Sequence, residues 1–349
     1  MPANSLINHY DKRALKGFAE ELLVPNTFLV KTFFRDMEEF ASEAVDLDLY
    51  KGKRRVGAYV KRRAEGQLVD KIGYSTKTFN PPYLKPKTPI TPGDIQKRQA
   101  GQFLYDNSSN LSSAVEDFVA RQINDLDNII TRNEELQAMQ ALFNGIVTAL
   151  DVDGNTLATI DYGRDAALSY TVSTLWDAGT EDPLKDCRAA RRLVQQKSGF
   201  TPRLVLMGSD AADAFLASSE VQGQLSKDWS ARGNLAYDMR EDGGIWLGHA
   251  DGFDFWSYDE YIIDPADSTE KLLVPSKKVL IASPNARATR TYGSIEVADF
   301  EGNLTIEAAA RYVDMYGEKD PASTIVQVHS APLMVTNHPD AYATLTVLT

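Results

Sequence analysis

The side chains best suited to catalysis in this 349-residue chain are its histidines, its single cysteine and several groups of carboxylates. The histidines do not have the spacing of a metal-ligand set: they are His9, His249, His329 and His338. Ser330, His338 and Asp340 could be drawn as the triad of an acyl-transfer enzyme, in which a base activates a hydroxyl. A polar turn at 338–340 explains the same residues more simply, because the triad would have to converge from strand and turn positions.

A group of carboxylates could bind a cation: Asp251, Asp254, Asp259, Glu260 and Asp264. Aromatic residues are interleaved with them from Phe253 to Tyr258, which instead indicates a strand with one solvent-facing side. The stretch 151–155, DVDGN, has the composition of a calcium loop, but its glycine stands fourth instead of sixth. Cys187 falls in a predicted amphipathic helix, where a small buried side chain is expected. The sequence also lacks nucleotide-binding, zinc-protease and serine-hydrolase motifs, so we expect no cofactor, no metal and no catalytic residue.

The charge of the chain is divided unevenly. The net charge is −12, yet residues 51–98 contain thirteen Lys and Arg and only three acidic residues, so the rest of the chain carries −22. A basic segment on an acidic body indicates either nucleic acid or the acidic surface of another copy as its partner. No helix-turn-helix or zinc finger accompanies the charge, which favours self-association. The loop residues that we expect at contacts between copies are Lys53, Arg54, Arg55, Lys61, Arg62 and Arg63.

One long helix, at about 112–145, is the element around which the chain is organised. Apolar residues recur at three- and four-residue steps from Val115 to Phe143 and form one stripe on a 3.6-residue period. Ser113 and Glu116 have the spacing of a capping box, and Gly145 stands where a left-handed residue would end the helix. The charged residues of this segment, Asp127 and Glu134 among them, are assigned to the other faces.

Strand patterns surround the helix. Residues 45–49 alternate, and 55–60 and 67–74 could form the two limbs of a long hairpin. Five prolines in 80–92 predict a stiff, extended connector. Residues 146–160 read as a hairpin turning at Asp153 and Gly154. From Asp182 onward helices and strands alternate, with helices at about 183–199 and 209–217 and strands at 203–207, 253–263 and 278–282. With no apolar run long enough to span a membrane, we expect a soluble intracellular protein.

Three segments resemble the closing region of the lambda-type major capsid proteins of tailed bacteriophages: ARATRTYGSIEVAD (286–299), AARYVDMYGEKDPAS (309–323) and HSAPLMVTNHPDAY (329–342). The run PPYLKPKTPITP (81–92) resembles that family's exit from its extended loop, and FLVKTFFRDM (28–37) resembles its N-terminal apolar block. The middle of the chain, about 183–282, matches only in its alternation of elements.

The resemblance implies an α+β architecture, the Hong Kong 97-type phage capsid fold. Its parts would be an N-terminal arm (1–48), an extended loop made of a long β-hairpin (49–90), a peripheral domain (91–182 and 283–349) containing the long spine helix, and an axial α/β domain (183–282). Arg287, Arg290 and Tyr292 stand in the best-matching motif. They are expected to fix the returning strand and pair with acidic groups, either between copies or within one subunit.

The implied function is that of a major capsid protein, which builds an icosahedral shell of pentamers and hexamers around the double-stranded DNA genome of a phage. The implied partners are further copies, a small decoration protein, a scaffold and a portal protein, with no membrane and no specific DNA site. The location would be the virion, after assembly in the bacterial cytoplasm. Two alternatives stay open here: a non-viral, encapsulin-like protein cage, and a hydrolase that uses 183–282.

Overall fold

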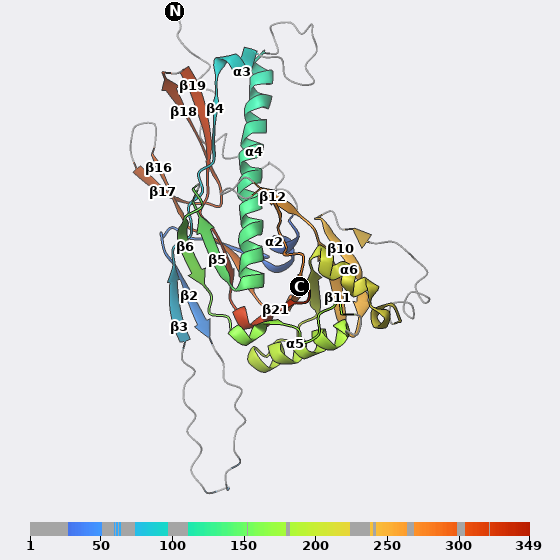
Figure 1. The fold of residues 1–349 in the computed structure, drawn as a ribbon. Coiled ribbons are helices and arrows are strands. Elements are labelled where there is room, and N and C mark those ends of the chain that lie inside the picture. The colour runs from blue at the N-terminus through green and yellow to red at the C-terminus, as the bar shows by residue number, and fades with distance from the viewer. Residues whose placement is uncertain are drawn as a thin grey trace, which may run out of the picture.

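The computed structural model describes residues 27–50, 59, 61, 63, 74–96, 111–151, 153–178, 182–223, 238–239, 242–263, 269–298, 304–320 and 322–349. Helices and strands are mixed along these residues, which confirms the α+β class. Figure 1 shows one long helix along a narrow upper part and a broader lobe beside its lower end. No helix in the described part of the chain is long and apolar enough to cross a membrane.

The long helix is α4, Leu111–Met139, which continues as a π-helical turn over Gln140–Asn144 and ends at Gly145 with a φ of 70°. We call α4 the spine helix. Its C-terminal end is as expected, because glycine adopts the left-handed conformation without a Cβ penalty. The predicted capping box is wrong, since Ser113 already lies inside the helix. The apolar pattern is also not fully buried, since Ile129 within it is 45% exposed.

The upper half of the spine helix packs against a three-stranded sheet in the order β18-β19-β4 (Figure 1). Its strands are Tyr312–Lys319, Ala322–His329 and Lys87–Ile90. Val119, Ile123 and Ile130 bury their side chains with apolar residues of this sheet. The proline-rich connector is therefore only partly a spacer, because 87–90 pairs with β19 as an edge strand. Pro89 is tolerated there, since an edge strand needs fewer amide donors.

The lower half of the spine helix packs on the N-terminal apolar block. Residues 28–33 form helix α2, Phe28–Phe33, and five of its six residues are buried. Strand β1, Asp36–Glu39, follows and pairs in parallel with β15, Ala288–Tyr292, which also pairs with β20, Pro332–Thr336. This three-stranded sheet joins the N-terminal segment to the end of the chain.

Three two-stranded ribbons extend from the body. Strands β2 (Val45–Tyr50) and β3 (Tyr74–Phe79) pair and form the base of the loop, while the limbs expected at 55–60 and 67–74 fall almost entirely outside the described residues. Strands β5 (Ile146–Leu150) and β6 (Thr156–Asp161) form the predicted hairpin, but only Gly154 of the two expected turn residues has a positive φ. Strands β16 (Ser294–Ala298) and β17 (Leu304–Ala308) form the third ribbon.

The broad lobe contains a seven-stranded sheet in the order β7-β21-β14-β8-β11-β10-β9. These strands are Ser169–Thr171, Tyr342–Thr346, Lys278–Ala282, Leu204–Met207, Phe253–Tyr258, Gly244–Ala250 and Asp238–Met239. The expected strand at 253–263 is two strands, because β12, Tyr261–Ile263, pairs instead with β13, Glu270–Leu272. The domain division stays a prediction, and this sheet draws β7 and β21 from outside 183–282.

Helices α5, Pro183–Lys197, and α6, Ser209–Ala217, pack on this sheet as the sequence predicts. Asp182 caps α5 by accepting a hydrogen bond from the Lys185 amide at 2.9 Å. Cys187 is fully buried, which confirms its structural assignment, and burial raises the pKa of its thiol. The remaining short helices are α3, Pro92–Gln96, and 3₁₀ turns at Ala166–Leu168 and Pro339–Ala341.

Candidate functional site: buried carboxylates of the spine helix

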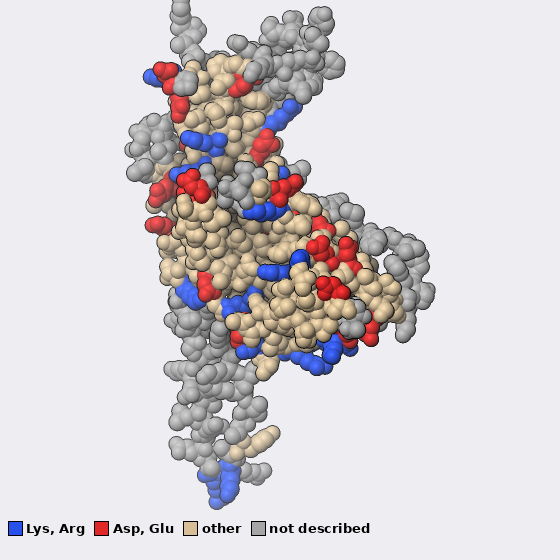
Figure 2. Space-filling model, in the orientation of Figure 1, with Lys and Arg blue, Asp and Glu red and all other residues tan. Residues whose placement is uncertain are grey.

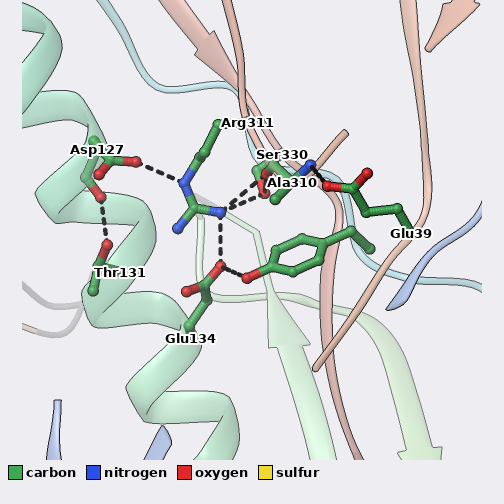
Figure 3. Close-up of polar contacts among 8 residues, drawn as sticks. Glu39, Asp127, Thr131, Glu134, Ala310, Arg311 and Ser330 are labelled. Atoms are coloured by element: carbon green, nitrogen blue, oxygen red, sulfur yellow. Dashed lines mark hydrogen bonds and ion pairs between the residues drawn. The ribbon is translucent and has the colours of Figure 1, made fainter. Parts of the chain in front are cut away.

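Arg311 lies at the centre of a buried polar cluster between the spine helix and the last third of the chain (Figure 3). Its Nε donates to Asp127 Oδ1 at 2.6 Å and its Nη1 donates to Glu134 Oε1 at 2.7 Å. Asp127 and Glu134 are seven residues apart, so they lie on the same face of the helix. One guanidinium thus joins two helical turns of α4 to the start of β18.

The cluster extends to further strands through the neighbours of Arg311. Ser330 accepts a hydrogen bond from Arg311 at 3.1 Å and donates to the Ala310 carbonyl at 2.8 Å. The Ala310 amide donates to Glu39 Oε1 at 3.0 Å, which ties in β1. The Tyr292 hydroxyl donates to Glu134 at 2.9 Å. Segments from both ends of the chain therefore meet at two carboxylates of one helix.

The charged side chains of this cluster have little contact with solvent. The side chains of Arg311, Asp127 and Glu134 are 16%, 11% and 3% exposed. Burial lowers the pKa of Arg311, but the charge and hydrogen bond of Glu134 outweigh it and the pKa rises. Burial, followed by the charge of Glu134, raises the pKa of Tyr292. Arg311 therefore stays a cation, and Tyr292 stays a neutral donor.

A second buried carboxylate, Glu135, holds the N-terminal helix α2. Its two oxygens accept hydrogen bonds from the buried amides of Leu29 at 2.8 Å and Val30 at 3.1 Å. A helix start leaves such amides without partners inside the helix. Burial raises the pKa of Glu135 to about 7, although the hydrogen bonds to Leu29 and Val30 lower it. Glu135 thus replaces the N-cap side chain that Thr27 does not supply.

The contact residues expected from the sequence that the structure describes lie in different places. Lys53, Arg54, Arg55 and Arg62 lie outside the described residues, while Lys61 and Arg63 are exposed. Tyr292 joins the Arg311 cluster, and Arg287 lies on the surface with its Nε 3.9 Å from Asp36 Oδ2. Arg290 has a buried Nε without a hydrogen-bond partner among the described residues.

The alternative chemical groups do not assemble into a site either. Ser330 belongs to the Arg311 cluster, whereas His338 packs on Phe200 with ring centroids 5.0 Å apart and Asp340 accepts the Asp165 amide. The hypothetical triad is therefore not formed. Among the described residues no group of three or more His, Cys, Asp or Glu side chains could hold a metal ion.

Sequence reasoning missed the cluster because it only assigned Asp127 and Glu134 to helix faces away from the apolar stripe and did not expect those faces to be buried. Asp127 and Glu134 are 8% and 3% exposed, and Glu135, for which no position was predicted, is 2% exposed. A usable signal was present in Thr131, which lies between the two carboxylates and continues their stripe at helical spacing. The matching cation stands in the segment AARYVDMYGEKDPAS, which the resemblance had singled out.

This arrangement holds segments from distant parts of the chain on one helix. The same fold occurs in a crystal structure of a capsid protein assigned to a prophage of E. coli CFT073, with a TM-score of 0.68 and 16% identity over 97% of this chain and 99% of that one. It also occurs in the capsid of a native GTA particle, with a TM-score of 0.53 and 11% identity over 100% of both chains. The architecture is that of a Hong Kong 97-type capsid protein.

The chain belongs to the family described as phage major capsid protein E, whose model matches residues 11–347. It is 25% identical over 350 residues to the major capsid protein of Escherichia phage lambda, covering 96% of this chain and 98% of the relative. It is also 25% identical over 354 residues to the P21 prophage-derived major head protein of Escherichia coli O6:H1, covering 97% and 99%. The protein is a major capsid protein and not an enzyme, which confirms the expected class and excludes the hydrolase alternative.

Glu135 should make the stability of the subunit depend on pH. Its folded pKa of about 7 lies above the ordinary 4.5, so the stabilisation from its protonated form is complete below pH 4.5 and is lost as the pH rises through 7. We expect the free energy of unfolding in urea to fall by about 1–3 kcal/mol more in the wild type than in Glu135→Gln between pH 5 and 8. Glu38→Gln, at an exposed carboxylate, is the matched control and should keep the wild-type slope. Equal slopes in the wild type and Glu135→Gln would contradict the assignment.

Removing Arg311 should be costly, because it leaves two buried carboxylates without their cation. Arg311→Met is expected to lower the free energy of unfolding by about 3–5 kcal/mol, the usual cost of breaking a buried pair. Arg311→Lys keeps the charge but cannot reach both carboxylates in the same geometry, so its loss should be smaller. Urea denaturation of the dissociated subunit measures both. A loss below about 0.5 kcal/mol for Arg311→Met, as at ordinary surface positions, would show that the cluster is not structural.

Proposed function

We propose that this major capsid protein assembles as pentamers and hexamers into an icosahedral shell around the double-stranded DNA of a tailed bacteriophage. The observation that supports the proposal is the positive charge of the loop, which is opposite in sign to the charge of the rest of the chain. Residues 51–98 carry +10 while the rest of the chain carries −22, and Tyr59, Lys61 and Arg63 are exposed. Figure 2 shows Lys and Arg side chains at the far lower tip, remote from the body of the subunit.

A cationic tip that projects beyond its own subunit can meet acidic surface on an adjacent copy. In this proposal Lys53, Arg54, Arg55, Lys61, Arg62 and Arg63 make contacts between copies. Each exposed pair is worth only about 0–1 kcal/mol, but the contact repeats at every subunit of a shell. Arg287, Arg290 and Tyr292 have a different proposed role, which is to fix the returning strand β15. The geometry supports this role for Tyr292 and Arg287 through Glu134 and Asp36.

The acidic body suits a container for DNA. Strong phosphate binding depends on clustered Lys and Arg and would hinder the entry and exit of a packaged genome. A net charge of −12 instead supports weak, non-specific contact. The proposed location is the virion, with assembly in the bacterial cytoplasm.

A second small protein is the proposed decoration partner, together with a scaffold and a portal protein that the resemblance implies. Strand β1 supports the decoration protein, because all four of its residues are exposed and it is the edge of its sheet. An extended peptide can add a strand to such an edge through main-chain hydrogen bonds. The non-viral cage has no comparable support, because the matched family is that of phage capsid proteins.

Reversing the charge of the loop tip tests the proposal. The purified chain should form shells, or rings of five and six copies, when examined by light scattering and electron microscopy. Lys61→Glu, Arg62→Glu and Arg63→Glu together should block or weaken assembly at physiological salt without unfolding the subunit, because like charges then face each other across the contact. A matched variant places the same charge change at exposed positions elsewhere: Arg121→Glu, Arg132→Glu and Lys319→Glu.

The proposal for the loop fails if the loop-tip variant assembles as well as the wild type, or if both variants lose assembly equally. A wild-type chain that stays a monomer of 38.6 kDa under all salt and scaffold conditions would overturn the shell itself.

A further inference from the structure

Helix α5 presents a row of cations on one margin of the broad lobe. Lys185, Arg188 and Arg192 are spaced at three and four residues, so they share one face of the helix, while Leu184, Cys187 and Val194 are buried on the other. The acidic residue within the helix, Asp186, accepts the indole N–H of Trp176 at 3.1 Å. Burial raises the pKa of Asp186, while the charge of the neighbouring Lys185 lowers it. We call Lys185, Arg188 and Arg192 the basic edge.

Two cations of the basic edge make no ion pair with the described residues of their own subunit. Arg188 lies 3.7 Å from Asp182 and 3.4 Å from Asp251. Lys185 and Arg192 are exposed and make no ion pair with any described residue. Figure 2 shows Lys and Arg side chains along the lower margin of the lobe, where Figure 1 places α5.

A separate edge of the same lobe is acidic. Asp210 and Asp213 are exposed one helical turn apart on α6, and Asp259 is exposed just after β11. Partial burial raises the pKa of Asp259, and the charges of Asp213 and Asp210 raise it further. The three carboxylates are therefore close enough to repel one another, and they make no ion pair with a described residue. We call Asp210, Asp213 and Asp259 the acidic edge.

Apolar surface follows the acidic edge along the chain. Tyr261 and Ile263, on β12, are 56% and 71% exposed. Large exposed apolar side chains next to charged ones are the composition of an interface, with an apolar centre and a polar rim. In Figure 2 Asp and Glu side chains gather on the upper part of the lobe, away from the basic lower margin.

Two oppositely charged edges on one lobe suit a ring of identical copies. Closing a ring requires a head-to-tail contact between two different surfaces of the same chain. Opposite charges on those surfaces guide the approach and exclude the reversed pairing, in which like charges would meet. Cations from a neighbour would also relieve the repulsion among Asp210, Asp213 and Asp259.

We propose that the basic edge of one copy docks onto the acidic edge of the next copy around each ring of the shell. The partner is a second copy of this chain. This inference rests on the ring assembly proposed above and adds which two surfaces meet. The contact is distinct from that of the loop tip, because all of its charged residues lie on the broad lobe.

A charge swap tests this pairing. The basic-edge variant is Lys185→Glu with Arg192→Glu, the acidic-edge variant is Asp210→Lys with Asp213→Lys, and the composite carries all four changes. Every position is exposed, and circular dichroism melting checks that each subunit folds. The composite has the net charge of the wild type, so it is the matched control for total charge. Assembly is followed by light scattering at 0.1 M and 1 M salt.

Each single-edge variant should assemble less well at 0.1 M salt, because like charges then face each other across the contact. We expect the assembled fraction to fall about tenfold, which corresponds to a loss of about 1.4 kcal/mol of binding free energy. The composite should recover assembly, because every contact again joins opposite charges. At 1 M salt, where the Debye length is about 3 Å, the differences should shrink.

The pairing is overturned if folded single-edge variants assemble like the wild type, or if the composite assembles no better than they do. Loss of assembly in the basic-edge variant alone would assign that edge to another acidic partner, such as DNA or a scaffold protein. In each of these cases the wild-type shell persists, so the proposed function stands independently.

Discussion

The burial of three carboxylates of the spine helix, Asp127, Glu134 and Glu135, is the constraint on which the rest of the subunit depends. A buried carboxylate is stable only with a cation or hydrogen-bond donors at its oxygens, because desolvation otherwise costs several kcal/mol. Asp127 and Glu134 obtain Arg311, and Glu135 obtains the amides of Leu29 and Val30. The donors come from opposite ends of the sequence, so satisfying one helix places both the N-terminal block and the returning strands.

This arrangement separates what is fixed inside the subunit from what is left for its neighbours. The apolar faces of α2, of β20 and of the spine helix C-terminal to Ile130 are buried together in one core. The groups left outside include charged ones: Asp36, Glu38 and Glu39 of strand β1, Lys61 and Arg63 at the loop tip, and the two edges of the broad lobe. If the proposed contacts between copies are these weak, repeated charged ones, each is individually reversible, and the stability of the subunit and its proposed assembly would rest on different residues.

The elements with a strong local pattern could be predicted from the sequence. Helix α5 begins and ends near its predicted bounds because Asp182, Pro183 and Gly199 fix the caps locally, and α6 and β14 follow their patterns equally well. The errors occur where distant segments decide the outcome. Pro89 pairs in an edge strand because β19 is beside it, and the expected strand at 253–263 divides because its second part pairs with β13. Helical spacing places Glu134 in line with Asp127 and Thr131, but it does not identify the cation that allows Glu134 to be buried, since Arg311 lies 177 residues away.

Hydrogen exchange at the amides of Leu29 and Val30 tests the central claim most directly. Both amides donate to Glu135 and lie in a buried helix of only six residues, which could not persist alone. If buried carboxylates of the spine helix hold the N-terminal block in place, these amides in the dissociated, folded subunit should exchange only when the whole subunit unfolds. Exchange at the rate of unprotected amides, while the spine helix stays protected, would show that the block is not held by Glu135 and would contradict this account.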